Sequence, residues 1–95
     1  MIPMKPKHIL FDAAFEKKFE KYKKRLTEKE RANLRGKFEI FKENVFDKRL
    51  KTHKLKGRLE DYYAFSLSYE NRLVFKIADN ETVYLVEIGS HDVCY

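Results

Sequence analysis

Three short segments of this sequence gather side chains that can bind phosphate or transfer a proton. The first segment, residues 51–58, surrounds one imidazole with cations: Lys51, His53, Lys54, Lys56 and Arg58. Ammonium and guanidinium groups neutralise phosphate, and a histidine exchanges protons near neutral pH. The segment therefore suits phosphate binding combined with proton transfer, although a solvated basic loop with an incidental histidine has the same composition.

The second segment is the turn at residues 70–72, which joins two predicted strands. Arg72 begins an apolar strand, and arginine is the side chain best suited to bidentate contact with phosphate. An ion pair with a neighbouring carboxylate is the alternative role, and the sequence leaves both roles open. The candidate partners are Glu70, Glu87 and Asp61.

The third segment, residues 89–95, follows the last predicted strand. His91 and its neighbour Asp92 have the types needed for acid–base chemistry, and Tyr95 follows four positions after the histidine. A histidine near a chain end is also an ordinary surface residue, and Tyr95 equally fits a frayed terminus. Cys94 is expected to pack as a small side chain, since no neighbouring group activates it.

Motifs for other chemistries are missing from the sequence. It contains no glycine-rich phosphate loop, no cysteine pair or HExxH motif for zinc, and no G-x-S-x-G turn. The carboxylates lack the spacing of a metal-binding loop. We therefore expect neither a metal nor another cofactor, and we expect His8, which is far from the three segments, to be structural.

The positive charge is concentrated in the first part of the chain. The net charge is +6, but residues 1–56 hold 18 basic and 8 acidic side chains, whereas residues 57–95 hold 3 and 7. Such a division favours a polyanionic partner, of which nucleic acid is the commonest. A lysine-rich solvated helix surface is the alternative.

The length and composition predict a single domain over residues 1–95. The chain is too short for two cores, and no apolar run approaches the roughly 20 residues that span a bilayer. One cysteine, Cys94, forms no internal disulfide, which fits a reducing cytoplasm. We therefore expect a cytoplasmic protein without membrane contact.

Periodicity predicts two helices followed by three strands. Apolar side chains repeat with helical spacing, and a capping box at Thr27 to Glu30 separates two such stripes: Phe15, Phe19, Tyr22 and Leu26, then Leu34, Phe38, Phe41 and Val45. Residues 62–69 alternate, with Tyr63, Phe65, Leu67 and Tyr69 on one face. Strands follow at 72–77 and 82–88, while residues 8–11 supply an edge strand. The expected fold is α+β, in the order β-α-α-β-β-β, with an N-terminal helical hairpin packed on a small, mostly antiparallel sheet.

The segments at 50–57, 62–75 and 88–92, in this order, resemble the RelE/ParE superfamily of bacterial toxins. The resemblance is closest to the RelE and YafQ types, which are messenger-RNA endonucleases of type II toxin–antitoxin pairs, and it covers nearly the whole chain. It implies cleavage of the message in the ribosomal A site, without metal, by attack of the ribose 2′-hydroxyl on the adjacent phosphate. It also implies a cognate antitoxin as a tight protein partner.

The resemblance assigns roles to individual residues. His53 matches the family's histidine in the basic turn and would act as base, while His91 matches the C-terminal histidine and would act as acid. The remaining matches are Arg72 with Lys54 and Lys56 as phosphate-holding cations, and Tyr95 near the position where some members place a functional aromatic. Beside these matches, we expect Lys51 and Arg58 to be further RNA contacts and Glu70 and Asp92 to be supporting groups. Ser66 and Glu70 stand where YafQ toxins have His and Asp, which favours a mechanism with two histidines.

Two other functions remain open at this point. The same scaffold carries gyrase-poisoning toxins, against which the two histidines His53 and His91 count. The second alternative is a non-catalytic module that binds RNA or a protein partner.

Overall fold

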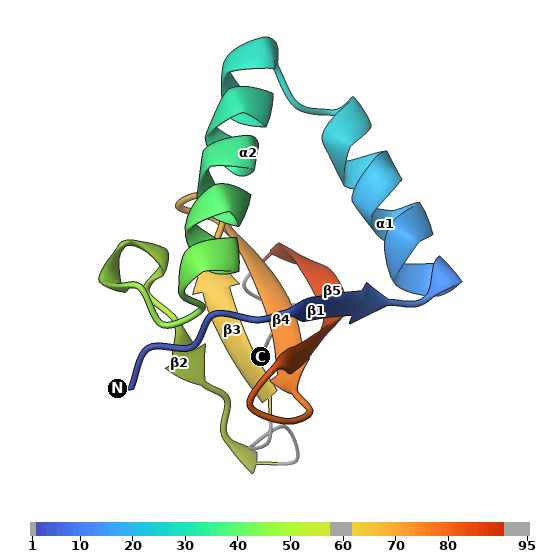
Figure 1. Ribbon diagram of the computed structural model, residues 1–95. Helices are drawn as coiled ribbons and strands as arrows, with labels where there is room; N and C mark the ends of the chain where they lie inside the picture. The colour runs from blue at the N-terminus through green and yellow to red at the C-terminus, as the bar shows by residue number, and fades with distance from the viewer. Residues whose placement is uncertain (1, 58–61, 91–95) are drawn as a thin grey trace.

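A computed structural model of the chain describes residues 2–57 and 62–90. In the described ranges, two helices lie against a five-stranded sheet (Figure 1). The sheet order is β1-β5-β4-β3-β2, with β1 parallel to β5 and the other neighbours antiparallel. The elements are β1 (His8–Phe11), α1 (Ala13–Lys24), α2 (Glu28–Glu43), the 3-10 helix η1 (Lys48–Leu50), β2 (His53–Lys54), β3 (Tyr62–Ser66), β4 (Asn71–Ile77) and β5 (Thr82–Ser90). This arrangement confirms the predicted α+β fold.

Both helices begin at side-chain caps. At α1, the Asp12 carboxylate accepts a hydrogen bond from the Phe15 amide at 2.8 Å. The predicted capping box is present at α2, where the Glu30 amide donates to the Thr27 hydroxyl and the Thr27 amide donates to the Glu30 carboxylate. These bonds satisfy amides that the helices leave without partners, and they define the break between the two helices.

Aromatic rings fasten α2 to the sheet. Phe41, Phe65 and Phe75 are fully buried, and the Phe41 ring centre lies 4.8 Å from that of Phe65 and 5.0 Å from that of Phe75. Burying a side chain of this size contributes about 1.5–3 kcal/mol. All eight residues of the two predicted helical stripes belong to this core or pack against it. Leu26 and Val45 do so from positions just beyond the helix ends.

The strand predicted at residues 62–69 is shorter than expected. β3 ends at Ser66, and residues 67–70 bend back toward β4, held by a 3.0 Å hydrogen bond from the Leu67 amide to the Asn71 carbonyl. The prediction that Tyr69 shares the buried face is therefore wrong, because its side chain is 95% exposed. The alternation ends where the chain leaves the ladder.

The basic segment after η1 contributes a strand that the predicted order lacks. His53 and Lys54 form β2 and pair with Ala64 and Tyr63 of β3, which extends the sheet by one edge strand. Leu55, which follows this strand, is 2% exposed. A two-residue strand has too little alternation to be recognised in a sequence.

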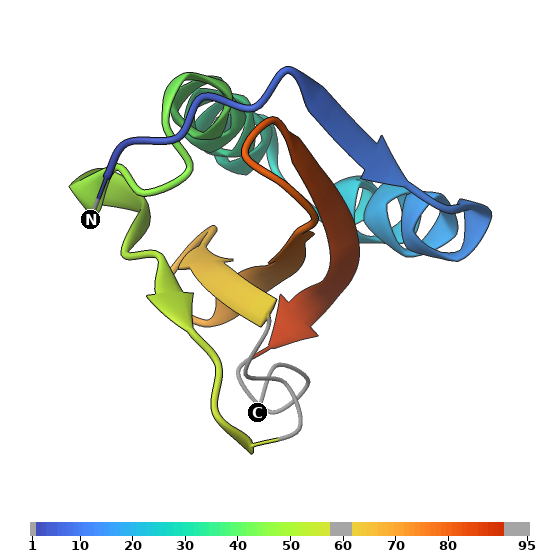
Figure 2. The same ribbon diagram turned by 60° about the horizontal axis from the view of Figure 1, so that its bottom comes forward.

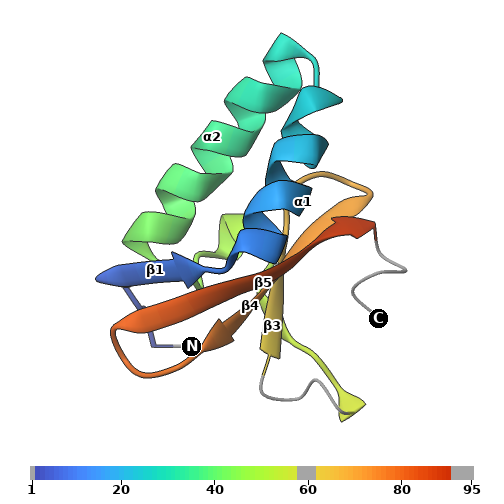
Figure 3. The ribbon, with the colours of Figure 1, turned by 90° about the vertical axis from the view of Figure 1, so that its right-hand side faces the viewer.

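The strongly curved sheet has two faces, with its edge strands β1 and β2 on opposite sides (Figure 2). Alternate side chains of β4 and β5, such as Phe75 and Val83, are buried toward α1 and α2, which cover one face only (Figure 3). We call the other face the open face. The strand registers place these side chains on it: Leu10, His53, Tyr62, Ala64, Ser66, Arg72, Val74, Lys76 and Tyr84. None of the helices in the described ranges has the length and apolar character needed to cross a membrane.

Candidate functional site

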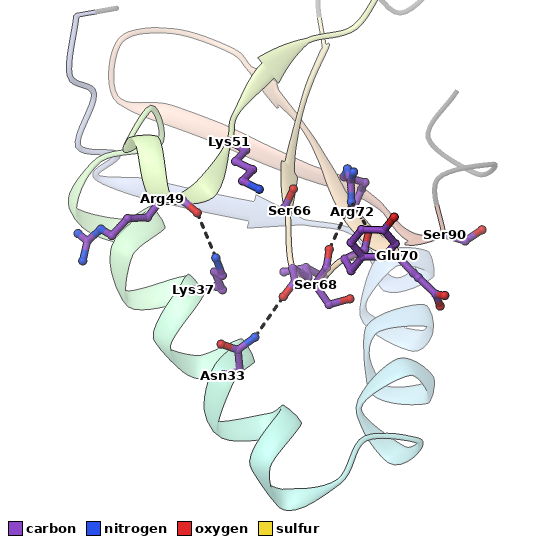
Figure 4. Close-up of a pocket in the computed structure, with 11 residues that line it drawn as sticks. Asn33, Lys37, Arg49, Lys51, Ser66, Ser68, Glu70, Arg72 and Ser90 are labelled. Atoms are coloured by element: carbon purple, nitrogen blue, oxygen red, sulfur yellow. Dashed lines mark hydrogen bonds between the residues drawn. The ribbon is translucent and has the colours of Figure 1, made fainter.

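A cleft of about 850 Å³ lies where α2, the end of η1 and the β3–β4 turn meet (Figure 4). We call it the cationic cleft. Its lining residues come from four separate parts of the chain: Asn33, Lys37, Arg49, Lys51, Ser66, Leu67, Ser68, Tyr69, Glu70, Arg72 and Ser90. Four of these side chains are cations, and the one carboxylate among them is that of Glu70. The charge of the lining therefore favours an anion, and its serines and asparagine add hydrogen-bonding groups.

Arg72 is held in the cleft by its own turn. Its Nη1 donates to the backbone carbonyls of Ser68, Tyr69 and Asn71 at 3.3–3.4 Å. Its Nε is buried and has no hydrogen-bond partner among the described residues. These carbonyl contacts fix the plane of the guanidinium, and the unsatisfied Nε is a donor that an additional acceptor would satisfy.

The ion pair with Glu87 that the sequence allowed for Arg72 is not formed. The Glu87 carboxylate instead accepts from Lys18 of α1 at 2.7 Å. Glu70 lines the cleft beside Arg72, and Asp61 lies outside the described residues. The positive charge of Arg72 is therefore not neutralised by Glu87, whose carboxylate is paired with α1.

Lys51 reaches the cleft from a strained backbone position. It ends η1 in the left-handed conformation with φ of 55°, which costs a residue with a side chain roughly 1 kcal/mol. The next residue is anchored, because the Thr52 hydroxyl donates to the Val45 carbonyl at 2.6 Å. The Lys51 side chain points from this position toward Ser66 (Figure 4).

The Arg49 side chain is engaged away from the cleft. Its Nε and Nη2 donate to the two carboxylate oxygens of Asp47, each at 2.9 Å, and these hydrogen bonds lower the pKa of Asp47 to about 2. The guanidinium points away from the cleft in Figure 4, while the Arg49 carbonyl accepts from Lys37 Nζ at 3.1 Å. The positive charge of the cleft therefore comes from Lys37, Lys51 and Arg72.

Sequence reasoning missed the contribution of α2. Asn33 donates through Nδ2 to the Leu67 carbonyl at 3.3 Å, and Lys37 follows one turn later on the same side of the helix. Both positions lie beside the apolar stripe that contains Leu34 and Phe38. The only feature in the sequence that could have indicated these two residues is a polar side chain next to a buried stripe. That feature is too common in helices to identify a site.

The predicted site residues divide between the cleft and its surroundings. Lys51, Glu70 and Arg72 line the cleft together, whereas His53, Lys54 and Lys56 are not among its lining residues. His53 lies on the open face opposite Ala64, with its Nδ1 3.2 Å from the Lys51 carbonyl, and Lys54 occupies the other face of β2. The predicted residues Arg58, His91, Asp92 and Tyr95 lie outside the described residues.

The fold is that of small bacterial toxins. A chain of the E. coli DinJ–YafQ toxin–antitoxin complex is 17% identical with a TM-score of 0.73, and the match covers 97% of this chain and 99% of that one. The YoeB/ParE toxin from Agrobacterium tumefaciens is 14% identical, with a TM-score of 0.71 and coverages of 88% and 98%. The conserved hypothetical protein HP0894 from Helicobacter pylori is 22% identical, with a TM-score of 0.61 and coverages of 90% and 94%.

The sequence itself identifies the family. Residues 7–94 match the family described as "Bacterial toxin of type II toxin-antitoxin system, YafQ". The chain therefore belongs to the YafQ family of type II toxin–antitoxin toxins, which confirms the resemblance found in the sequence. No curated protein matches the chain.

Proposed function

We propose that this toxin is an endoribonuclease that cuts messenger RNA in the ribosomal A site and so inhibits translation in the cytoplasm. The observation that carries the proposal is the cationic cleft, which Lys51 at the end of η1 and Arg72 of β4 both line. A phosphate held by these two cations would gain charge-assisted hydrogen bonds.

The proposed reaction is attack of a ribose 2′-hydroxyl on the adjacent phosphate. A base removes the hydroxyl proton, cations stabilise the charge that grows on the phosphate oxygens, and an acid protonates the leaving 5′-oxygen. The products are a 2′,3′-cyclic phosphate and a 5′-hydroxyl end. Lys51 and Arg72 are the cations of this scheme, with Lys54, Lys56 and Arg58 as further contacts along the RNA.

The histidines are proposed as the proton-transferring groups. His53 would be the base and His91 the acid, with Tyr95 as a further catalytic group and Glu70 and Asp92 in support. The position of His53 supports this assignment, because it shares the open face with Arg72. The partner of His53 across the ladder, Ala64, stands two residues before Ser66, which is opposite Arg72.

We further propose that an antitoxin protein binds this chain and blocks its site. The E. coli relative is described as a toxin–antitoxin complex. A groove of about 570 Å³ between α1 and α2 would accept an apolar face of a partner helix, since its lining includes Phe11, Phe15, Phe19 and Phe38. Acidic residues of the partner would also be attracted to the cationic cleft.

The decisive experiment adds the purified protein to translating ribosomes and maps the ends of the message. We expect cuts within the codon in the A site, with 2′,3′-cyclic phosphate on the upstream fragment. Intact message would contradict the enzymatic function and leave a binding module. Inhibition of gyrase in a parallel supercoiling assay would favour the gyrase-poisoning alternative.

A further inference from the structure

A row of large side chains crosses the open face beyond the cationic cleft. The strand registers place Tyr62 of β3 opposite Lys76 of β4, Lys76 opposite Tyr84 of β5, and Tyr84 opposite Leu10 of β1. Four adjacent strands thus contribute one side chain each to a single line across the sheet.

Three members of this row are exposed, and the fourth, Tyr62, is half-buried. Tyr84 is 45% exposed and Leu10 is 41% exposed, although their neighbours Val83 and Leu85 on the covered face are buried. Lys76 is exposed, and its Nζ lies 5.8 Å from the centre of the Tyr62 ring. Single exposed apolar residues are ordinary, whereas Tyr84 and Leu10 are exposed side by side and adjoin an exposed lysine, a combination typical of a binding surface.

The charge along the row favours a polyanion. Lys76 stands between the two tyrosines, and the same face of β4 leads through Val74 to Arg72, four residues or about 13 Å away. The carboxylate nearest to this path, that of Glu87 opposite Val74, is neutralised by Lys18. Between the row and Arg72, Val74 is 3% exposed and packs with Ala64 and Leu55, so a small buried cluster lies between two cationic positions, Lys76 and Arg72.

We propose that Tyr62, Lys76 and Tyr84 form a stacking platform for bases of single-stranded RNA next to the phosphate bound in the cationic cleft. The proposal rests on the proposed function, because the cleft supplies the neighbouring phosphate site. Tyrosine rings on an exposed sheet stack on any base, and a lysine between them contacts the phosphates that connect the bases. The platform holds bases at one end of β4 while Arg72 holds the reacting phosphate at the other end, and the strand passes over the buried cluster of Leu55, Ala64 and Val74 between them.

Binding of a short fluorescent 2′-O-methyl RNA, which this chemistry does not cut, tests the platform directly. Tyr84→Ala should weaken binding about 5- to 150-fold, the range for losing one base–aromatic stack. Tyr84→Phe keeps the ring and should bind like the wild type. Val86→Ala is the matched control, since Val86 is 39% exposed on the same strand at its irregularity, outside the row.

The salt dependence separates stacking from charge. Lys76→Gln should reduce the slope of log affinity against log salt by about 0.7, the value for one phosphate contact on a single strand. Tyr84→Ala should leave this slope unchanged while lowering affinity at every salt concentration. A Tyr84→Ala protein with native circular dichroism and wild-type RNA affinity would overturn the platform.

Two further outcomes would test the platform and the enzymatic function separately. If Tyr84→Ala leaves RNA binding intact but abolishes self-association in sedimentation, the row is a contact between copies of the chain and the proposal is wrong. If RNA binding depends on Tyr84 but wild-type protein leaves messages intact on ribosomes, the platform stands and the proposed enzymatic function falls. The two ideas thus fail separately.

Discussion

The two faces of the sheet differ in what they contribute to the protein. The covered face buries Phe65 and Phe75 completely against α2, whereas the open face leaves Tyr84 45% exposed and holds Arg72, whose Nε has no partner within residues 2–57 and 62–90. Most of the buried core lies on the covered face, while the open face combines a smaller buried cluster of Leu55, Ala64 and Val74 with groups that contribute little to stability. Substitutions on the two faces should therefore separate folding from RNA chemistry.

The largest expected effect lies on the covered face. Phe41→Ala removes a fully buried ring between α2 and the sheet and should lower the free energy of unfolding by about 3–5 kcal/mol. Val86→Ala, at a position that is 39% exposed, should change it by less than about 1 kcal/mol. Denaturant unfolding measures both. Equal losses would contradict the division between the faces.

Substitution of the two histidines should lower the cleavage rate without lowering the free energy of unfolding. His53→Ala and His91→Ala should each lower cleavage on ribosomes about 10²–10⁴-fold, which is the usual loss when a general acid or base is removed. The unfolding free energies should stay close to that of the wild type. If both variants cut the message at the wild-type rate, the acid–base assignment is wrong.

Lys51 allows charge and strain to be separated at one position. Lys51→Asn retains a residue that tolerates the left-handed backbone, and Lys51→Gly removes the strain, but both remove the cation. We expect both to lower cleavage about 10- to 100-fold, the value of one charged hydrogen bond, while Lys51→Gly unfolds at higher denaturant. Cleavage that follows stability instead of charge would make Lys51 a purely structural residue.

The smallest effect is expected at Asp47, whose carboxylate binds Arg49 away from the cleft. The Arg49 hydrogen bonds lower the pKa of Asp47 from 3.8 to about 2. Because the folded pKa lies below the unfolded one, the pair stabilises the fold above about pH 4, and this contribution is lost as the pH falls toward 2. Asp47→Asn should flatten the pH dependence of unfolding in that range and leave cleavage at neutral pH unchanged. Reduced cleavage would place Arg49 in the working site.

The sequence predicted the parts of the fold that depend on local patterns. The capping box at Thr27 and the stripe through Leu34 and Phe41 are signals within a few residues, and the structure contains both. The end of β3 depends on the hydrogen bond that returns the chain to Asn71, so the exposure of Tyr69 had no local signal. The strand at His53 likewise exists only because β3 offers a free edge.

The candidate site was predictable only where its residues share a segment or a family motif. Lys51, Glu70 and Arg72 were found in this way. Asn33 and Lys37 enter the cleft because α2 packs against the β3–β4 turn, a tertiary event that their spacing does not record. The roles of His53 and His91 remain predictions.

The account depends most on Arg72 acting on RNA from the open face. The direct test measures message cleavage on translating ribosomes by Arg72→Ala beside Lys5→Gln, which removes an exposed cation that does not line the cleft. We predict a loss of about 10²–10³-fold for Arg72→Ala, the value of one group that stabilises transition-state charge, with wild-type activity for Lys5→Gln and native circular dichroism for both. Wild-type cleavage by a folded Arg72→Ala protein would contradict the assignment of the cationic cleft as the catalytic site.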